Sequence, residues 1–129
     1  MTTSQTPTTA QRHEEICDQF LAHAREELAS GDLLQAAEKA WGAVSHCVNS
    51  IAKQRGWSVG THRVTINNAR RLIDTDPDPD QADRLRLQLQ ATQLLHQNFY
   101  EELMTEDDVS EGISDAAALV AALRRLATL

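Results

Sequence analysis

The apolar residues of this chain recur at intervals of three or four residues in every segment that has a clear pattern. The pattern is longest between residues 32 and 55, where it includes Leu34, Ala37, Trp41, Val44, Val48 and Ile51. This spacing places the apolar side chains on one face of an α-helix. The sequence has few runs of β-branched residues and no Asn-Gly or Asp-Gly turn of the kind that closes a β-hairpin. The pattern therefore predicts an all-α protein.

Breaks in the pattern divide the chain into four main helices and one short helix. Gly31 suits the end of the first helix, and Asp32 and Thr61 suit the caps of the second and third. The acidic stretch 105–112 is expected to be a turn. The expected helices span about 9–30, 32–55, 62–74, 80–104 and 114–128. Because the short links make neighbouring helices antiparallel, we expect an up-and-down antiparallel bundle.

Several residues of these helices are expected to lie in the core. Cys17 and Cys47 form no CxxC motif, so they are interpreted as small buried residues. Gly42 is expected to make room for a bulky neighbour on another helix. The fourth helix is expected to turn the following side chains inward: Leu85, Leu89, Thr92, Leu95 or His96, Phe99 and Leu103.

The length of 129 residues fits one domain. Residues 1–10 are rich in threonine and uncharged, so we expect a disordered leader there and a single helical domain over residues 11–129. The start of the chain lacks the basic and apolar regions of a signal peptide. No apolar run is long enough for a transmembrane helix. These features predict a cytoplasmic protein with no membrane contact.

The net charge of −7 is unevenly distributed along the chain. The segment 39–73 carries +6 and has no acidic residue, whereas residues 1–38 carry −5 and residues 74–129 carry −8. Its basic residues are Lys39, Lys53, Arg55, Arg63, Arg70 and Arg71. Such a segment can bind an anion even in an acidic protein, because the local field governs binding. The alternative is that these cations pair with acidic neighbours across the bundle.

The stretch 94–103, LLHQNFYEEL, places the single tyrosine and one of the two phenylalanines of the chain beside a histidine and an asparagine. In one interpretation His96 acts as a general acid or base. In the other, the stretch forms a seam against the second helix, where its polar groups bond to Glu38, Lys39 or Ser45. The seam would then comprise Glu38, Lys39, Trp41, His96, Asn98, Phe99 and Tyr100.

Arg55 and His62 flank a loop that contains two glycines and lies within the basic segment. Such a pair can cleave RNA without a metal, because histidine moves a proton and arginine stabilises the charge that develops on the phosphate. Trp57 in the same loop could stack on a base. Alternatively, His62 begins a helix and Trp57 covers the end of the bundle. The residues expected to bind RNA or a nucleotide are Lys53, Trp57, Arg63, Arg70 and Arg71.

Two longer stretches are distinctive, GDLLQAAEKAWGAV at 31–44 and LHQNFYEELM at 95–104. The basic AKQRGW at 52–57, the lone His62 and Val109 add to them. Together they resemble the PaREP family of small prokaryotic helical proteins, which is grouped with the HEPN superfamily (higher eukaryotes and prokaryotes nucleotide-binding). The resemblance covers about residues 25–128. It implies a HEPN-like bundle that forms a homodimer.

Many HEPN domains are metal-independent ribonucleases of toxin–antitoxin and defence systems. Their signature is an arginine followed, after four to six residues, by a histidine. Arg55 and His62 have six residues between them, so the resemblance implies catalytic roles for both, although Arg55 ends a helix and a glycine loop follows it. Other HEPN proteins are non-catalytic and serve as nucleotide-binding or protein-binding partners of a nucleotidyltransferase.

Three functional hypotheses remain open. The first is a HEPN-like module of prokaryotic defence or toxin–antitoxin type that binds RNA or a nucleotide through the segment 39–73. The second is a metal-independent endoribonuclease toxin that uses Arg55 and His62. The third is a non-catalytic interaction module that binds a nucleotidyltransferase or an antitoxin. The sequence contains no HExxH motif, Gly-rich phosphate loop or GxSxG motif, so no metal or other cofactor is expected.

Overall fold

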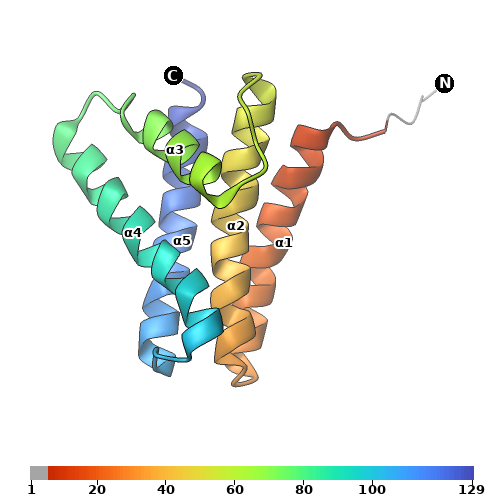
Figure 1. The fold of residues 1–129 in the computed structure, drawn as a ribbon, viewed down its shortest axis with the longest axis vertical. Coiled ribbons are helices and arrows are strands. Elements are labelled where there is room, and N and C mark those ends of the chain that lie inside the picture. Colours follow the sequence, from red (N-terminus) through yellow and green to blue (C-terminus); the bar gives the residue numbers. More distant parts are fainter. Residues whose placement is uncertain (1–5) are drawn as a thin grey trace.

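The computed structural model describes residues 6–129, which form five α-helices and no strand. The helices are α1 (Thr9–Ala29), α2 (Leu33–Gln54), α3 (His62–Ile73), α4 (Pro79–Glu101) and α5 (Glu106–Leu126). In Figure 1, α1, α2, α4 and α5 run alternately down and up, and the short α3 lies across the upper half of the bundle. The prediction of an all-α, up-and-down bundle of four main helices and one short helix is confirmed.

Side-chain caps determine where the helices begin. The carboxylate of Asp32 accepts a hydrogen bond from the N–H of Gln35 at the start of α2, and the hydroxyl of Thr61 accepts one from Val64 at the start of α3. Gly31 has a φ of +84°, a left-handed conformation that residues with a side chain disfavour. The helix boundaries expected at these positions are therefore present.

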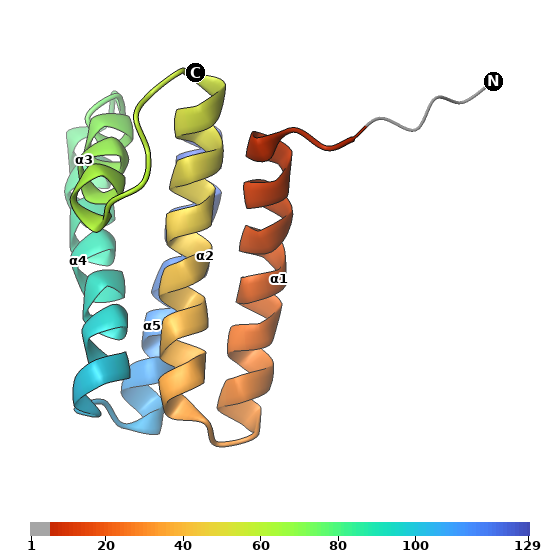
Figure 2. The same cartoon turned by 45° about the vertical axis from the view of Figure 1, so that its right-hand side comes forward.

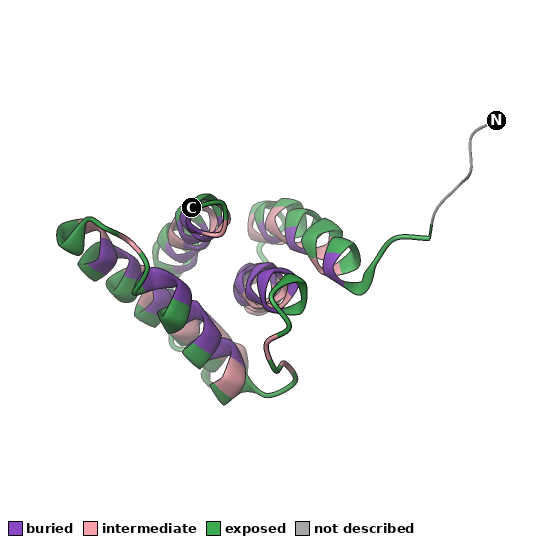
Figure 3. Cartoon of the chain, turned by 90° about the horizontal axis from the view of Figure 1, so that it is seen from above, coloured by how far each residue is buried: buried purple, intermediate pink, exposed green. Residues whose placement is uncertain are grey.

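The central helix is α2, which packs against each of the other four. Figure 2 shows α1 and the α3–α4 pair on opposite sides of α2, and Figure 3 shows from above how much of α2 is buried. An added Cβ at Gly42 would lie 2.6 Å from a ring carbon of Phe20, so this glycine admits the ring as expected. Cys17 and Cys47 are both buried, which was also expected.

The start of α5 differs from the sequence prediction. The acidic stretch 105–112 was expected to be a turn, but α5 begins at Glu106. The side chain of Thr105 and the backbone and side chain of Asp108 form a reciprocal capping box. Three acidic residues occupy the first turn, where the positive end of the helix dipole stabilises negative charge. The prediction was wrong because an acidic run favours a helix start as well as a turn.

The end of α4 also differs from the prediction. The helix ends at Glu101, and Glu102 turns the chain away with a φ of +55°. Leu103 was expected to face the core, but it lies beyond the helix and is 72% exposed. Phe99 is only half-buried, and Asn98 takes the buried position instead.

The ends of the predicted domain are only partly described. The leader expected over residues 1–10 falls in part on residues 1–5, which lie outside the described range, and α1 already begins at Thr9. Within residues 6–129, no helix combines the length and the apolar character needed to cross a membrane.

Candidate functional site

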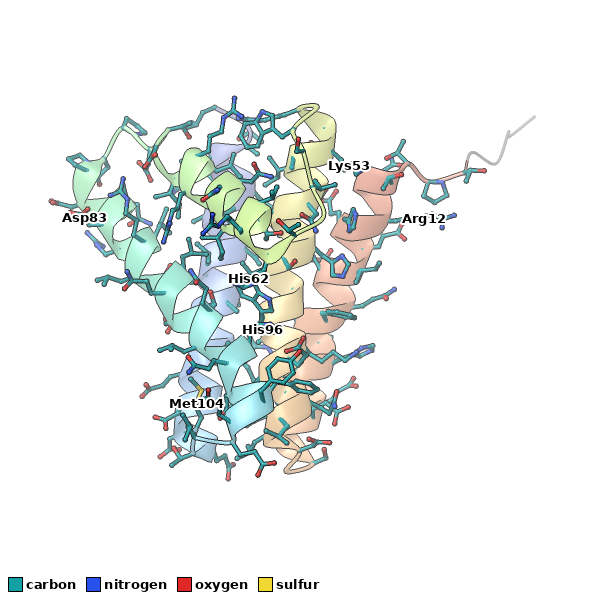
Figure 4. All side chains as sticks on the ribbon, in the orientation of Figure 1. Arg12, Lys53, His62, Asp83, His96 and Met104 are labelled. Atoms are coloured by element: carbon teal, nitrogen blue, oxygen red, sulfur yellow. The ribbon has the colours of Figure 1, made fainter. Side chains whose placement is uncertain are left out.

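Four rings from three helices meet where α3 begins. The imidazoles of His62 and His96 are stacked with 5.4 Å between their centroids, and Figure 4 shows them side by side. The indole of Trp41 lies 5.1 Å from the His62 ring and 6.0 Å from the His96 ring. The rings of Tyr100 and His96 are nearly perpendicular, with 5.4 Å between their centroids. These four residues are called the ring cluster below.

The sequence positions each member of the ring cluster through helix geometry. His62 is the first residue of α3, directly after its cap Thr61. His96 and Tyr100 are four residues apart on α4, so their side chains lie on the same face. Trp41 belongs to the buried stripe of α2 and is only 5% exposed. The cluster therefore has a buried floor and an accessible rim.

A carboxylate of α2 holds His96 in place. Nδ1 of His96 lies 3.0 Å from Oε2 of Glu38, and each side chain is about one-third exposed. An ionised carboxylate can only accept hydrogen bonds, so Nδ1 of His96 is the donor and, in the neutral ring, Nε2 is an acceptor. The bond between His96 and Glu38 that the sequence suggested is present.

The rest of the predicted seam is arranged differently. Oδ1 of Asn98 accepts a hydrogen bond of 2.7 Å from the N–H of Met104, so it satisfies the backbone after α4 and does not reach α2. Nζ of Lys39 lies 4.2 Å above the ring of Phe20 and is directed to α1. The interpretation that Asn98 bonds to the second helix was therefore wrong, because the backbone N–H of Met104, just after α4, is a closer donor.

An open hollow lies beside the exposed side of the ring cluster. Its volume is about 610 Å³, and its lining comprises His62, Gln90, Gln93, Leu94, His96, Gln97 and Tyr100. Tyr100 is 71% exposed and Leu94 is 51% exposed. None of the three glutamines was predicted from the sequence to belong to a site. Their spacing of three and four residues on a predicted helix would have placed them on one face.

The basic segment has no internal carboxylate partners among residues 6–129. The ion pairs in this range join Arg86 to Asp74 and Asp83, Arg124 to Asp18, Arg125 to Asp76, and His96 to Glu38. None of them includes a cation of the segment 39–73. On α3, Arg63 and Arg70 are both exposed and seven residues apart, so they share one face. The alternative in which these cations pair across the bundle is not what the structure has.

Two of the arginines pack on Trp57. The guanidinium carbon of Arg71 lies 3.9 Å from the centre of the Trp57 ring system, and that of Arg55 lies 5.4 Å away. Arg55 also donates a hydrogen bond of 3.1 Å to the backbone carbonyl of Ala127. Trp57 is half-buried against the core. It therefore covers the end of the bundle, as one of the two interpretations expected.

Arg55 and His62 have different partners in the hydrogen bonds and ring contacts of residues 6–129. Arg55 is held by the chain end after α5 and by Trp57, whereas His62 packs on Trp41 and His96. Within one chain, the two residues therefore lie in different environments.

A second pair of histidines joins α1 to α2. Nδ1 of His13 lies 2.7 Å from Nδ1 of His46, and burial lowers the pKa of both rings. Deeper in the same interface, a hydrogen bond with Cys17 and then burial raise the pKa of the Cys47 thiol. Among residues 6–129, no three histidine, cysteine, aspartate or glutamate side chains gather in a way that could hold a metal ion.

Comparison with known proteins gives one family and one fold. A family model described as the archaeal PaREP1/PaREP8 family matches residues 12–120, a range that contains the whole ring cluster. A crystal structure of a protein from Sulfolobus solfataricus aligns with 95% of this chain and 98% of that one, with a TM-score of 0.66 and 18% sequence identity. At this identity the likeness concerns the fold alone. None of the curated proteins matches the chain.

Proposed function

The chain belongs to the archaeal PaREP1/PaREP8 family, and we propose that it is a helical module that binds RNA or a nucleotide through the basic segment 39–73. One observation carries the proposal: the cations of this segment have no carboxylate partner within residues 6–129. Unpaired exposed cations in an acidic protein create a local positive field, which attracts a polyanion.

The face of α3 that carries Arg63 and Arg70 suits an extended anion. The two residues are separated by about 10 Å along the helix axis, given a rise of about 1.5 Å per residue. Two of the acidic residues that follow α3 are themselves paired with cations outside it, Asp74 with Arg86 and Asp76 with Arg125. Lys53, near the end of α2, is also exposed, but it lies on the side of α2 that faces α1 (Figure 4).

A ribonuclease that uses Arg55 and His62 has less support. Its chemistry requires the guanidinium and the imidazole to act on one phosphate. In the single chain, Arg55 is occupied by the Ala127 carbonyl and Trp57. A homodimer could still bring Arg55 of one chain to His62 of the other, so cleavage should be assayed together with binding.

The binding proposal is tested with labelled single-stranded RNA and fluorescence anisotropy across a series of salt concentrations in EDTA. The double variant Arg63→Gln/Arg70→Gln should bind more weakly, and its slope of log affinity against log salt should fall by about 0.7 per cation removed. Arg25→Gln is the matched control, because Arg25 is exposed on α1, which contacts neither α3 nor α4 within the described residues. If the wild type does not bind at low salt, or if the double variant keeps the full slope, the proposal is wrong.

An interaction module is the second candidate, because apolar side chains are exposed along and after α4. Those of Leu87, Leu94, Tyr100 and Leu103 are 65%, 51%, 71% and 72% exposed. Such a surface suits a second copy of the chain or another protein. Leu87 lies outside the ring hollow, so a Leu87→Glu variant that changes a dimer into a monomer in analytical ultracentrifugation would support this candidate.

The other expectations stay predictions from the sequence. They are HEPN superfamily membership, a role in defence or toxin–antitoxin systems, a nucleotidyltransferase or antitoxin partner, and a cytoplasmic location.

A further inference from the structure

The only tyrosine of the chain stands at the rim of the ring cluster with 71% of its surface exposed. Aromatic side chains contribute most to stability when they are buried, so this exposure gives up that contribution. His62, also exposed, is stacked on His96 only a short distance away. Together these residues present flat π-surfaces to the hollow, and every nucleobase has a π-face that can stack on such surfaces.

The ring cluster is held rigidly by contacts behind it. Trp41 is buried and lies against both histidines. Glu38 fixes the orientation of His96 through Nδ1. The three rings nearest the hollow come from α3 and α4, both of which pack on α2. A site that is already ordered loses little conformational entropy when a flat ligand stacks on it.

The hollow also offers polar groups that match the edges of bases. Gln90, Gln93 and Gln97 recur at three and four residues along α4 and line it. A glutamine amide both donates and accepts hydrogen bonds, as base edges do. The amide nitrogen of Gln97 donates to Glu101 at 3.0 Å, which leaves its carbonyl oxygen as an acceptor.

The row of exposed cations on α3, which belongs to the proposed RNA-binding surface, starts next to this hollow. His62 lines the hollow, and the next residue along α3 is Arg63, which is exposed and has no carboxylate partner in the described chain. A strand whose phosphates follow α3 would therefore pass the mouth of the hollow.

We infer that the hollow holds one base of the bound RNA, stacked on the ring of Tyr100 and in edge contact with His62, whose ring is nearly perpendicular to that of Tyr100, with the hydrogen-bonding edge of the base towards the glutamines of α4. The inference rests on the proposed function, since it names the part of the RNA that this neighbouring site receives. It makes the protein a reader of single-stranded RNA or of a nucleotide, because the bases of a duplex are stacked on each other and not free to enter.

The experiment compares two labelled strands of equal length and charge, one of RNA and one in which every base is missing. The wild type should bind the RNA strand at least about fivefold more tightly, the lower end of the range for one base stacked on an aromatic ring. Tyr100→Ala should remove most of this preference, and His62→Ala should reduce it by a smaller factor. Both should leave the affinity for the base-free strand and its salt dependence unchanged. Tyr100→Phe should keep the preference, because it keeps the ring. His23→Ala is the control for an exposed histidine elsewhere, on α1.

A second readout lies within the cluster. In a Trp57→Phe background, Trp41 is the remaining tryptophan and lies 5.1 Å from the His62 ring. The RNA strand should change its fluorescence in a saturable way, and the base-free strand should not. Circular dichroism establishes that each variant is folded.

The outcomes separate the two proposals. If the wild type binds both strands equally, the base site is wrong while the RNA surface stands. The same conclusion holds if His62→Ala and Tyr100→Ala, both folded, keep the full preference. If the wild type binds neither strand at low salt, the RNA surface is wrong and the base site is wrong with it.

Discussion

The contact of Gly112 with Leu95 gives a quantitative test of how tightly α5 packs against α4. A Cβ added at Gly112 would lie 3.0 Å from Cγ of Leu95 and would overlap the end of that side chain. Leu95 is fully buried, so it can shift only by displacing packed core neighbours. His96 follows Leu95 directly, and the fit between these two helices therefore positions the ring cluster.

Two opposing effects determine whether Gly112→Ala stabilises or destabilises the folded protein. Replacing glycine by alanine inside a helix stabilises it by about 0.8–1 kcal/mol. Overfilling a packed core costs about 1–3 kcal/mol. Because Leu95 can shift only by displacing its neighbours, overpacking should exceed the gain in helix propensity, and the variant should lose up to about 2 kcal/mol of unfolding free energy.

A double-mutant cycle separates these effects. Leu95→Ala alone should cost about 2–5 kcal/mol, because it leaves a cavity. In that background, Gly112→Ala meets no leucine side chain and should stabilise the protein by about 1 kcal/mol. The two substitutions should therefore be coupled by about 1–3 kcal/mol, as residues in direct contact often are.

The measurement is urea unfolding followed by circular dichroism, with the midpoint compared at constant m-value. The reasoning is refuted if Gly112→Ala costs the same free energy in both backgrounds. It is equally refuted if Gly112→Ala stabilises the otherwise wild-type protein, since the Leu95 side chain would then not restrict this site.

Three further predictions concern other parts of the bundle. Burial lowers the pKa of His13 and His46 in the folded protein below the ordinary value of 6.5. As the pH falls, these histidines therefore take up protons in the unfolded chain before they do so in the folded protein. The free energy of unfolding should be highest above pH 6.5 and should fall as the pH decreases below it. Urea midpoints between pH 8 and pH 5 measure this, and a His13→Gln variant should show a shallower fall. Asn98→Ala should cost about 1–3 kcal/mol of unfolding free energy, because it leaves a backbone N–H without its partner. An unchanged urea midpoint would contradict this. Glu38→Ala should lower the free energy of unfolding by only about 0.5–1 kcal/mol, because both side chains of the Glu38–His96 pair are about one-third exposed to solvent. A clearly larger loss would contradict this prediction.

The sequence predicted the elements whose signals are local. The apolar spacing identified α2 within two residues at each end, and the caps Asp32 and Thr61 were found from residue type alone. Glu38 was one of three candidate partners of His96, with Lys39 and Ser45, because the stretch 94–103 was expected to pack against the second helix. The start of α5 was missed, since an acidic run before an apolar pattern can be a turn or the first turn of a helix, and only the capping box at Thr105 distinguishes them.

Contacts that depend on how helices align could not be predicted. His13 and His46 are 33 residues apart, and they meet because the packing of Phe20 on Gly42 sets the alignment of α1 with α2. The stacking of His62 on His96 depends on the direction of α3. An irregular loop sets that direction, and a hydrogen bond from Asn68 to the Ser58 carbonyl fixes it. Periodicity says nothing about either arrangement.

The environment of each basic residue divides the segment into two roles, and this division is testable at adjacent positions. Arg71 stacks on Trp57 and helps to fix α3 to the end of α2, whereas Arg70 is exposed without a partner of either kind in the described chain. Arg70→Gln should therefore weaken RNA binding and lower its salt dependence while the urea midpoint stays unchanged.

Arg71→Gln removes the same charge, but it should also lower stability by about 0.5–1 kcal/mol, the usual contribution of an exposed cation–π contact. Equal stability of the two variants would mean that the contact between Arg71 and Trp57 does not stabilise the fold, and that both arginines are free to contact RNA. Unequal stability would show that the chain uses one of two neighbouring arginines to hold α3 in place and leaves the other for the ligand.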